Sequence, residues 1–165
     1  MRILFGLMML GVSVTGHSQT PAQPFTLTLS AVRSQVFAGA QIEISVVMTN
    51  SSDHQIDCTG APSNGLDRNF KYDVLYKDGQ KAPKRINKHP HVGPTSSIWP
   101  CVIKPGGTAR NAGGLISALY DFSRPGEYKV QVERYTAFDP NSPTVKSNTI
   151  TIRVLSADEP SPAQP

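Results

Sequence analysis

The residues with the most chemical potential lie in one stretch, 88–101, which reads KHPHVGPTSSIWPC. In an extended segment, side chains two positions apart return to one face, so His89 and His91 are placed to offer both imidazoles to zinc or copper. Two ligands hold a metal weakly, and His54 or an acid would have to complete the site. The simpler interpretation is a polar loop, and on it we expect neither metal nor cofactor.

The sequence contains few other patterns that indicate catalysis or cofactor binding. The sequence contains no GxSxG, HExxH or Walker pattern, and no GxGxxG that opens a helix. A catalytic triad can converge from distant positions, but only four histidines are available to serve as its base. We therefore predict that the protein is not an enzyme.

The N-terminus predicts export. Arg2 forms a short positive region, an apolar run follows over 3–14, and small residues stand at Gly16 and Ser18. This pattern is typical of a secretory signal peptide over 1–18, and it is short for a membrane span. No later apolar run is long enough to cross a bilayer, so we expect a periplasmic or extracellular protein without a transmembrane segment.

Cys58 and Cys101 are the two cysteines of the chain. An even number of cysteines in an oxidising compartment favours a disulfide between them. The alternative is that both thiols bind a metal, but their spacing matches no CxxC pattern.

A basic stretch lies across the middle of the chain. It comprises Lys77, Lys81, Lys84, Arg85 and Lys88, within a formal net charge of +4 over 165 residues. Such a stretch suits an anionic polysaccharide or a lipid headgroup, or it is a solvated edge strand whose lysines block edge-to-edge pairing. No aromatic residues alternate with these cations, so we expect no nucleic-acid partner.

The segments that must position these residues read as short strands. Apolar and polar residues alternate with period two, which is typical of strands that bury one face. The alternating runs are FTLTLSA at 25–31, QIEISVVMT at 41–49, FKYDVLY at 70–76, EYKVQVERY at 127–135 and NTITIRVL at 148–155. Turn signals separate them, including a Lys-Asp-Gly-Gln hairpin at 77–80. The Pro-rich segments 19–24 and 156–165 are predicted to be a linker and a disordered tail around one domain at 25–155.

This pattern predicts an all-β fold, an Ig-like antiparallel β-sandwich of Greek-key type with about seven to nine strands. Pro125 and Gly126 stand just before Tyr128, which resembles a tyrosine corner, where the ring hydroxyl bonds to backbone upstream. Val130 then occupies the position of the second immunoglobulin cysteine. That disulfide is therefore excluded, and Cys58 and Cys101 would tie loops or a strand edge.

At this level the chain resembles bacterial Ig-like and fibronectin-like modules. The order VVMTNSSDHQI, FKYDVLYKDGQ, IKPGGTA and RPGEYKVQV is similar to the family named for a Bacillus intracellular proteinase inhibitor, over about residues 40–134. The resemblance implies a β-sandwich. The export signal and the segment 81–104, which lacks a Trp-Ser signature, depart from that family, so we carry over the fold and not the inhibition.

We therefore predict an exported, non-enzymatic binding or interaction module of the cell envelope. A secreted proteinase inhibitor and a metal-binding protein that uses His89 and His91 remain the alternatives. The predicted partner is an unidentified protein or envelope component. The long loop between strands is the predicted partner surface, because loops of this length are uncommon unless functional. Its candidate residues are Lys84, Arg85, His89, His91 and Trp99.

Overall fold

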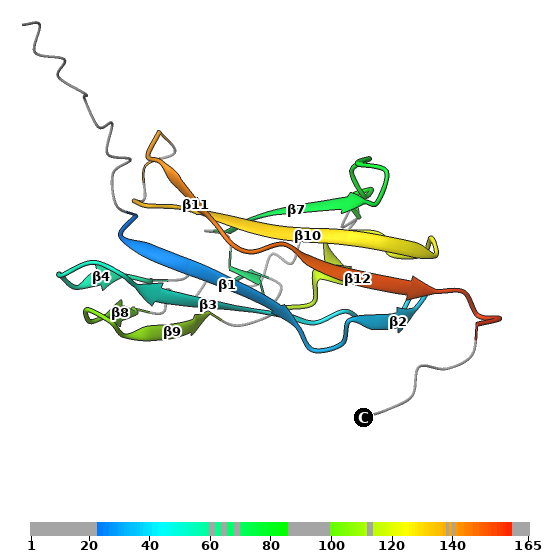
Figure 1. The fold of residues 1–165 in the computed structure, drawn as a ribbon, viewed down its shortest axis with the longest axis horizontal. Coiled ribbons are helices and arrows are strands. Elements are labelled where there is room, and N and C mark those ends of the chain that lie inside the picture. Colours follow the sequence, from blue (N-terminus) through cyan, green and yellow to red (C-terminus); the bar gives the residue numbers. More distant parts are fainter. Residues whose placement is uncertain are drawn as a thin grey trace, which may run out of the picture.

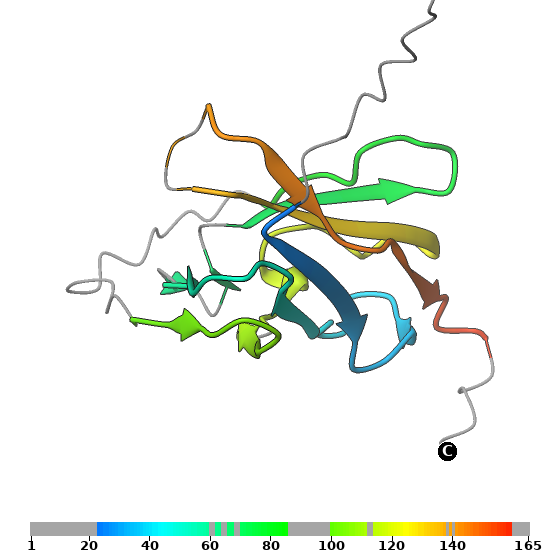
Figure 2. The same ribbon diagram turned by 60° about the vertical axis from the view of Figure 1, so that its left-hand side comes forward.

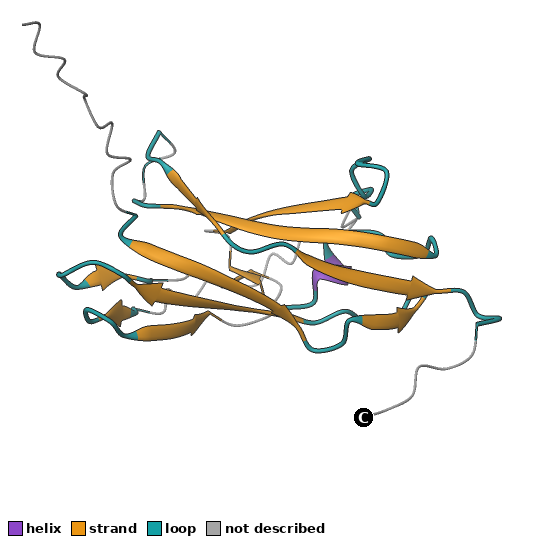
Figure 3. Cartoon of the chain, viewed as in Figure 1, coloured by secondary structure: helices purple, strands orange, loops and turns teal. Residues whose placement is uncertain are grey.

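The computed structural model describes residues 23–59, 62–63, 66–67, 70–85, 100–111, 114–137, 139 and 141–159. These residues form an all-β fold with one short 3₁₀ helix at Ile116–Ala118 (Figures 1 and 3). The longer strands are β1 (Phe25–Ala31), β3 (Ile44–Asn50), β7 (Phe70–Tyr76), β9 (Thr108–Asn111), β10 (Gly126–Tyr135) and β12 (Ile150–Leu155). The shorter ones are β2 (Gln35–Phe37), β4 (Ile56–Asp57), β5 (Pro62–Ser63), β6 (Leu66–Asp67), β8 (Val102–Ile103) and β11 (Thr144–Lys146).

The first main sheet has the strand order β1-β3-β9, and both pairings are antiparallel. Along β1 and β3 the apolar residues at alternate positions are buried, and the residues between them face away from the core. The period-two pattern of the sequence therefore produces a sheet with one buried face, as expected for antiparallel strands.

The second main sheet has the order β11-β10-β12-β2, with β7 paired to β10. Strand β10 pairs antiparallel with β7, β11 and β12. The short strand β2 pairs with β12 in the parallel direction, which departs from the purely antiparallel sheet that the sequence predicts.

The two main sheets lie one over the other and enclose a single hydrophobic core (Figures 1 and 2). Ile44 and Met48 contribute to it from β3, while Val130 and Val132 contribute from β10, and all four are almost completely buried. Each such side chain stabilises the fold by about 1.5–3 kcal/mol relative to exposure, which makes this shared core the main source of rigidity.

The five alternating runs of the sequence are confirmed as β1, β3, β7, β10 and β12, with boundaries that agree within three residues. The hairpin after β7 is also confirmed, because Tyr76 N–H donates to the Gln80 carbonyl at 2.8 Å and Gly79 has φ of 84°. The described residues form eight strands of three or more residues and four of two residues, against the seven to nine expected. The two-residue strands have too few positions to produce a periodic pattern.

Candidate functional site

Two of the five predicted surface residues lie in the described part of the chain. Lys84 and Arg85 are exposed at the end of the segment that returns from the hairpin after β7. His89, His91 and Trp99 lie outside the described residues, as does Lys88, so the predictions made for them stay predictions.

The segment 81–85 is held in place by backbone hydrogen bonds on two sides. Ala82 N–H donates to the Val74 carbonyl of β7 at 2.8 Å. On the other side, Arg85 N–H donates to the Leu119 carbonyl and Asp121 N–H donates to the Pro83 carbonyl, both at 2.8 Å. The segment therefore joins β7 to residues 119–121 and presents its cations from a fixed backbone.

Residues 119–124, which pair with the segment 81–85, carry another exposed cation. The guanidinium of Arg124 lies over the ring of Tyr76, 4.6 Å from its centroid. Tyr76 also begins the hairpin that carries Lys77, whose N–H donates to the Glu127 carbonyl at 3.0 Å. Arg124 is exposed, and no sequence pattern had linked it to the basic stretch.

We call this surface the basic end. It consists of Lys77, Lys81, Lys84, Arg85 and Arg124, all of them exposed. Asp121 partly offsets the charge, because its carboxylate lies 3.8 Å from the Arg85 guanidinium. Both groups are well hydrated, so this pair contributes little to stability and leaves the guanidinium available to an external anion.

The tyrosine corner underlies the basic end and is confirmed. The hydroxyl of Tyr128 donates to the Arg124 carbonyl at 2.8 Å, as the Pro-Gly-Glu-Tyr motif predicts. The Tyr128 ring is fully buried and lies 4.6 Å from the Tyr76 ring and 4.7 Å from the Phe122 ring, measured between centroids. Burial raises the pKa of the Tyr128 phenol well above its usual value, with the Tyr76 hydroxyl adding to the effect.

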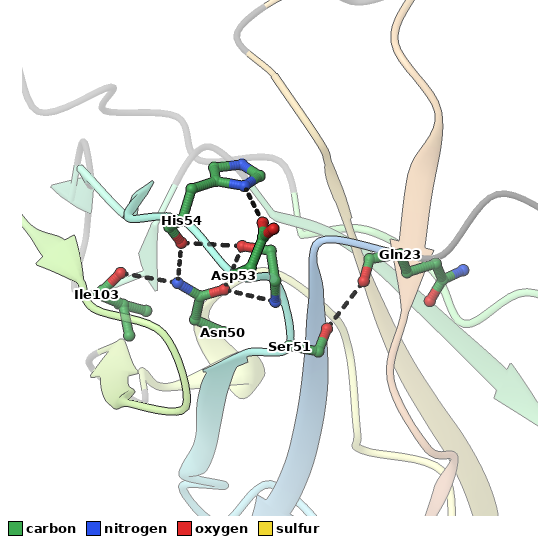
Figure 4. Close-up of polar contacts among 7 residues, drawn as sticks. Gln23, Asn50, Ser51, Asp53, His54 and Ile103 are labelled. Carbon is green, nitrogen blue, oxygen red and sulfur yellow. Dashed lines mark hydrogen bonds and ion pairs between the residues drawn. The ribbon is translucent and has the colours of Figure 1, made fainter.

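His54, which the sequence offered beside an acid as the third ligand of a metal site, lies in the turn that follows β3 (Figure 4). Its Nδ1 lies 3.0 Å from an Asp53 carboxylate oxygen, and this contact lowers the pKa of Asp53. Its carbonyl accepts a hydrogen bond from Asn50, whose amide also donates to the Ile103 carbonyl at 2.9 Å. Within the described residues, no group of three His, Cys, Asp or Glu side chains is placed to hold a metal.

The disulfide between Cys58 and Cys101 is present and ties β4 to β8, just outside the two main sheets. Cys58 N–H donates to the Cys101 carbonyl at 2.9 Å, so a backbone bond reinforces the covalent one. This placement confirms the prediction that the pair ties loops or a strand edge.

Arg134 is, after Arg124, a second residue that sequence reasoning missed. It continues the inward face of β10 beyond Val132, is 5% exposed, and lies 5.2 Å from the Phe70 ring centroid. Its guanidinium donates to the Thr59 carbonyl, next to Cys58, at 3.2 Å. The sequence could have indicated this buried arginine, because the period-two alternation of β10 places position 134 on the inward face.

Among the residues that the structure describes, no helix has the length and apolar character needed to span a bilayer.

Comparisons with known proteins give a limited result. No family model matches the chain, and no curated protein sequence matches it, so the resemblance to the proteinase inhibitor family stays a prediction. Among solved structures, the chain is similar to the E. coli chaperone DraB, at 14% identity and a TM-score of 0.36, over 81% of this chain and 56% of the chaperone. It is also similar to AvmM, which catalyses macrocyclization in alchivemycin A biosynthesis, at 16% identity and a TM-score of 0.38, over 87% and 94% of the two chains. The matched part of the chaperone is about half of its length.

Proposed function

We propose that this protein is an exported, non-enzymatic Ig-like binding module, and that its basic end contacts an anionic surface of an envelope partner. The single observation that carries the proposal is the fixed placement of exposed cations from two distant segments. Arg85 and Arg124 are 39 positions apart in sequence (124 − 85), yet one segment, 119–124, fixes both: Arg85 N–H bonds to the Leu119 carbonyl, and Arg124 lies over the Tyr76 ring.

Three features support the Ig-like class. The two main sheets, with the strand orders β1-β3-β9 and β2-β12-β10-β7, face each other across one core, and each combines strands from both halves of the chain. The parallel pairing of β2 with β12 places a strand from the N-terminal part of the chain beside the last strand. The tyrosine corner at the start of β10 is a recurrent feature of Greek-key sandwiches.

Export is supported by two features. The disulfide fits an oxidising compartment, where such bonds form and persist. The apolar N-terminal run fits a signal peptide.

The binding mode follows from the charges at the basic end. Arginine and lysine side chains that stand on a fixed backbone bind carboxylates or phosphates with less loss of conformational freedom than cations on a mobile loop. Complementary charge mainly raises the association rate and selects among partners, and its effect falls with salt. We therefore expect a salt-sensitive interaction with an acidic partner.

In-cell photocrosslinking tests this proposal. A photoreactive residue is placed at Lys84, and a matched one at Lys129, which is exposed on the outer face of β10. We expect a defined crosslinked partner from position 84 that weakens when Lys81, Arg85 and Arg124 are changed to Glu. Equal adducts from both positions, or adducts that survive the charge reversal, would contradict a partner site at the basic end.

A further inference from the structure

The outer edge of β1 is closed by a side chain. Leu29 N–H donates to the Asn148 Oδ1 atom at 2.8 Å, and Asn148 Nδ2 donates to the Leu29 carbonyl at 2.9 Å. The Asn148 amide thus takes the place of a neighbouring strand. A parallel bridge between Leu27 and Ser147 pairs the next outward-facing residue of β1. No outward backbone pair at the centre of β1 is left for another chain.

Two strands of the second sheet are covered as well. The return segment bonds the free side of β7, through Ala82 N–H and the Val74 carbonyl and through a bridge between Leu75 and Lys81. Strand β2 covers the far side of β12 from residue 153 to residue 155. Covering of this kind is how natural sheets avoid unwanted pairing with other chains.

Strand β9 is different. Asn50 N–H donates to the Gly107 carbonyl at 3.0 Å, and this bond shows which residues of β9 direct their backbone groups toward β3. In an antiparallel ladder every second residue bonds to the neighbour, so Ala109 and Asn111 point their backbone groups toward β3. The backbone groups of Thr108 and Arg110 point away, and no described residue pairs with them. In Figure 1, β9 lies at the lower margin of the described chain.

We propose that β9 is a dimerisation edge, which pairs antiparallel with β9 of a second copy of this chain. A two-fold axis at Ala109 brings Thr108 of one copy opposite Arg110 of the other, and the reverse. Each of these two pairs exchanges two backbone hydrogen bonds, since Thr108 and Arg110 are the outward-facing residues. The interface is isologous, as in most homodimers.

The side chains of β9 suit this register. The non-hydrogen-bonded pair on the axis brings its Cα atoms to about 4.5 Å, and the small side chain of Ala109 fits there from both copies. Arg110 faces Thr108, so no like charges stand directly opposite each other.

On β1 and β3 the outer face of the same sheet carries no charge, and Arg110, opposite Val47, is the charged residue that β9 adds to this face. Its residues on β1 and β3 are Thr26, Thr28, Ser30, Ser45, Val47 and Thr49. The dimer would extend the three-stranded sheet to six strands with a continuous hydroxyl-rich face. The Pro-rich segments 19–24 and 156–165 of the chain itself are poor competitors for the edge, because proline has no N–H to donate.

Sedimentation of the full mature chain over a range of concentrations tests the proposal. We expect a reversible monomer–dimer equilibrium that Thr108→Pro weakens about tenfold or more, since each copy loses an outward N–H without losing a bond to β3. Thr28→Lys, on β1 at the opposite side of the same sheet from β9, is the matched control and should leave the dimer intact. A chain that stays monomeric at every concentration would show that the edge takes another occupant or none, and would overturn the proposal. So would a dimer that Thr108→Pro leaves unchanged.

Amide hydrogen exchange in the unmodified chain provides a second readout, which does not depend on the folding of a variant. The Thr108 and Arg110 amides should exchange quickly in dilute solution and become protected as the concentration rises. The Ala109 and Asn111 amides should be protected throughout, because they bond to β3. Protection of Thr108 and Arg110 already in the dilute monomer would mean that the chain covers its own edge, and this would also overturn the proposal.

Discussion

Strand β10 carries two polar side chains on its inward face, one near each end, and the fold treats them differently. Tyr128 and Arg134 are six positions apart, about 20 Å along an extended strand, and both are almost fully buried. Tyr128 finds its hydrogen-bond acceptor four residues upstream, at the Arg124 carbonyl. Arg134 finds Thr59, which is 75 positions away.

The tyrosine end therefore combines one local hydrogen bond with aromatic packing that includes Tyr76 of β7. Rings of Tyr76 and Phe122 lie against Tyr128, and Arg124 lies over Tyr76. The arginine end is built from long-range contacts, with the Cys58–Cys101 disulfide beside the Arg134 hydrogen bond. The comparison teaches that the buried hydroxyl of Tyr128 finds its acceptor within its own turn, while the buried guanidinium of Arg134 needs segments far apart in sequence to meet. The tyrosine end is also the support of the basic end.

The largest effect expected is the loss of the disulfide. The bridge closes a loop with a sequence separation of 43, and the chain-entropy model assigns such a loop about 4 kcal/mol of stability. Cys58→Ala with Cys101→Ala should lower the free energy of unfolding by about that amount, measured by urea denaturation. Reductant should have the same effect on the unmodified protein and none on the double variant. A loss below about 1 kcal/mol would mean that the arginine end does not depend on the covalent link.

The second effect expected is the loss of Arg134. A buried hydrogen bond from a charged donor is worth about 1.5–3 kcal/mol, and Arg134→Ala should destabilise the fold by about that amount. Lys71→Ala is the matched control, because Lys71 lies over the Tyr135 ring at 4.3 Å on the exposed face and its removal should leave the unfolding midpoint unchanged.

A double-mutant cycle sharpens this comparison between the two ends. Arg134 bonds to the residue next to Cys58, so Arg134→Ala should cost less when the disulfide is already absent. Tyr128→Phe lies far from the bridge and should add to its loss without coupling. Equal coupling of both substitutions to the disulfide would contradict the separation of the two ends.

Tyr128→Phe is the next smaller change. It removes one hydrogen bond while keeping the ring, so the expected loss is about 1 kcal/mol at neutral pH. Because burial raises the pKa of Tyr128 above its usual 10.0, the folded state favours the neutral phenol. This contribution is complete below pH 10 and is lost as the pH rises toward the folded-state pKa.

The pH dependence gives the measurement. Urea midpoints of the unmodified chain should fall above pH 10, and the fall should be shallower in Tyr128→Phe. Tyr135→Phe, on the outer face of the same strand, is the control. Identical alkaline slopes in the unmodified chain and Tyr128→Phe would show that the buried phenol does not govern alkaline stability.

The difference between local and distant contacts also explains what the sequence could predict. The alternating strands, the hairpin at 77–80 and the tyrosine corner depend on neighbours within a few residues, and all three are confirmed. The cysteine pairing was predictable because only two cysteines exist and one pairing is available.

Other features were not predictable because their cause lies far away in the chain. Strand β9 reads TARN, without apolar alternation, and is a strand because β3 pairs with it. Asn148 resembles an ordinary turn residue in the sequence, and its role appears only when Leu29 lies beside it. At the candidate site, the exposed Lys84 and Arg85 were predicted from the basic stretch, whereas Arg124 joins them through the pairing of residues 83–85 with 119–121.

The smallest effect expected concerns Asp57, at the arginine end. Its carboxylate accepts the Thr59 N–H at 2.6 Å, and hydrogen bonds from Thr59, with a smaller contribution from the Arg134 charge, hold the pKa of Asp57 below its usual 3.8. A lowered folded-state pKa stabilises the fold above pH 3.8, and this contribution is lost as the pH falls below that value. Asp57→Asn should therefore leave a shallower loss of stability in acid.

Thermal unfolding between pH 5 and pH 2 measures this effect, with Asp158→Asn, in the turn after β12, as the control. The expected change is smaller than that of Tyr128→Phe, because Asp57 is exposed and water screens its interactions. The effect of Asp57→Asn should be smaller still in an Arg134→Ala background, since part of the lowering of the Asp57 pKa comes from the Arg134 charge. An acid profile that Asp57→Asn leaves unchanged would place the acid sensitivity elsewhere, and would leave the distant hydrogen bond of Arg134 as the main polar contact of this end.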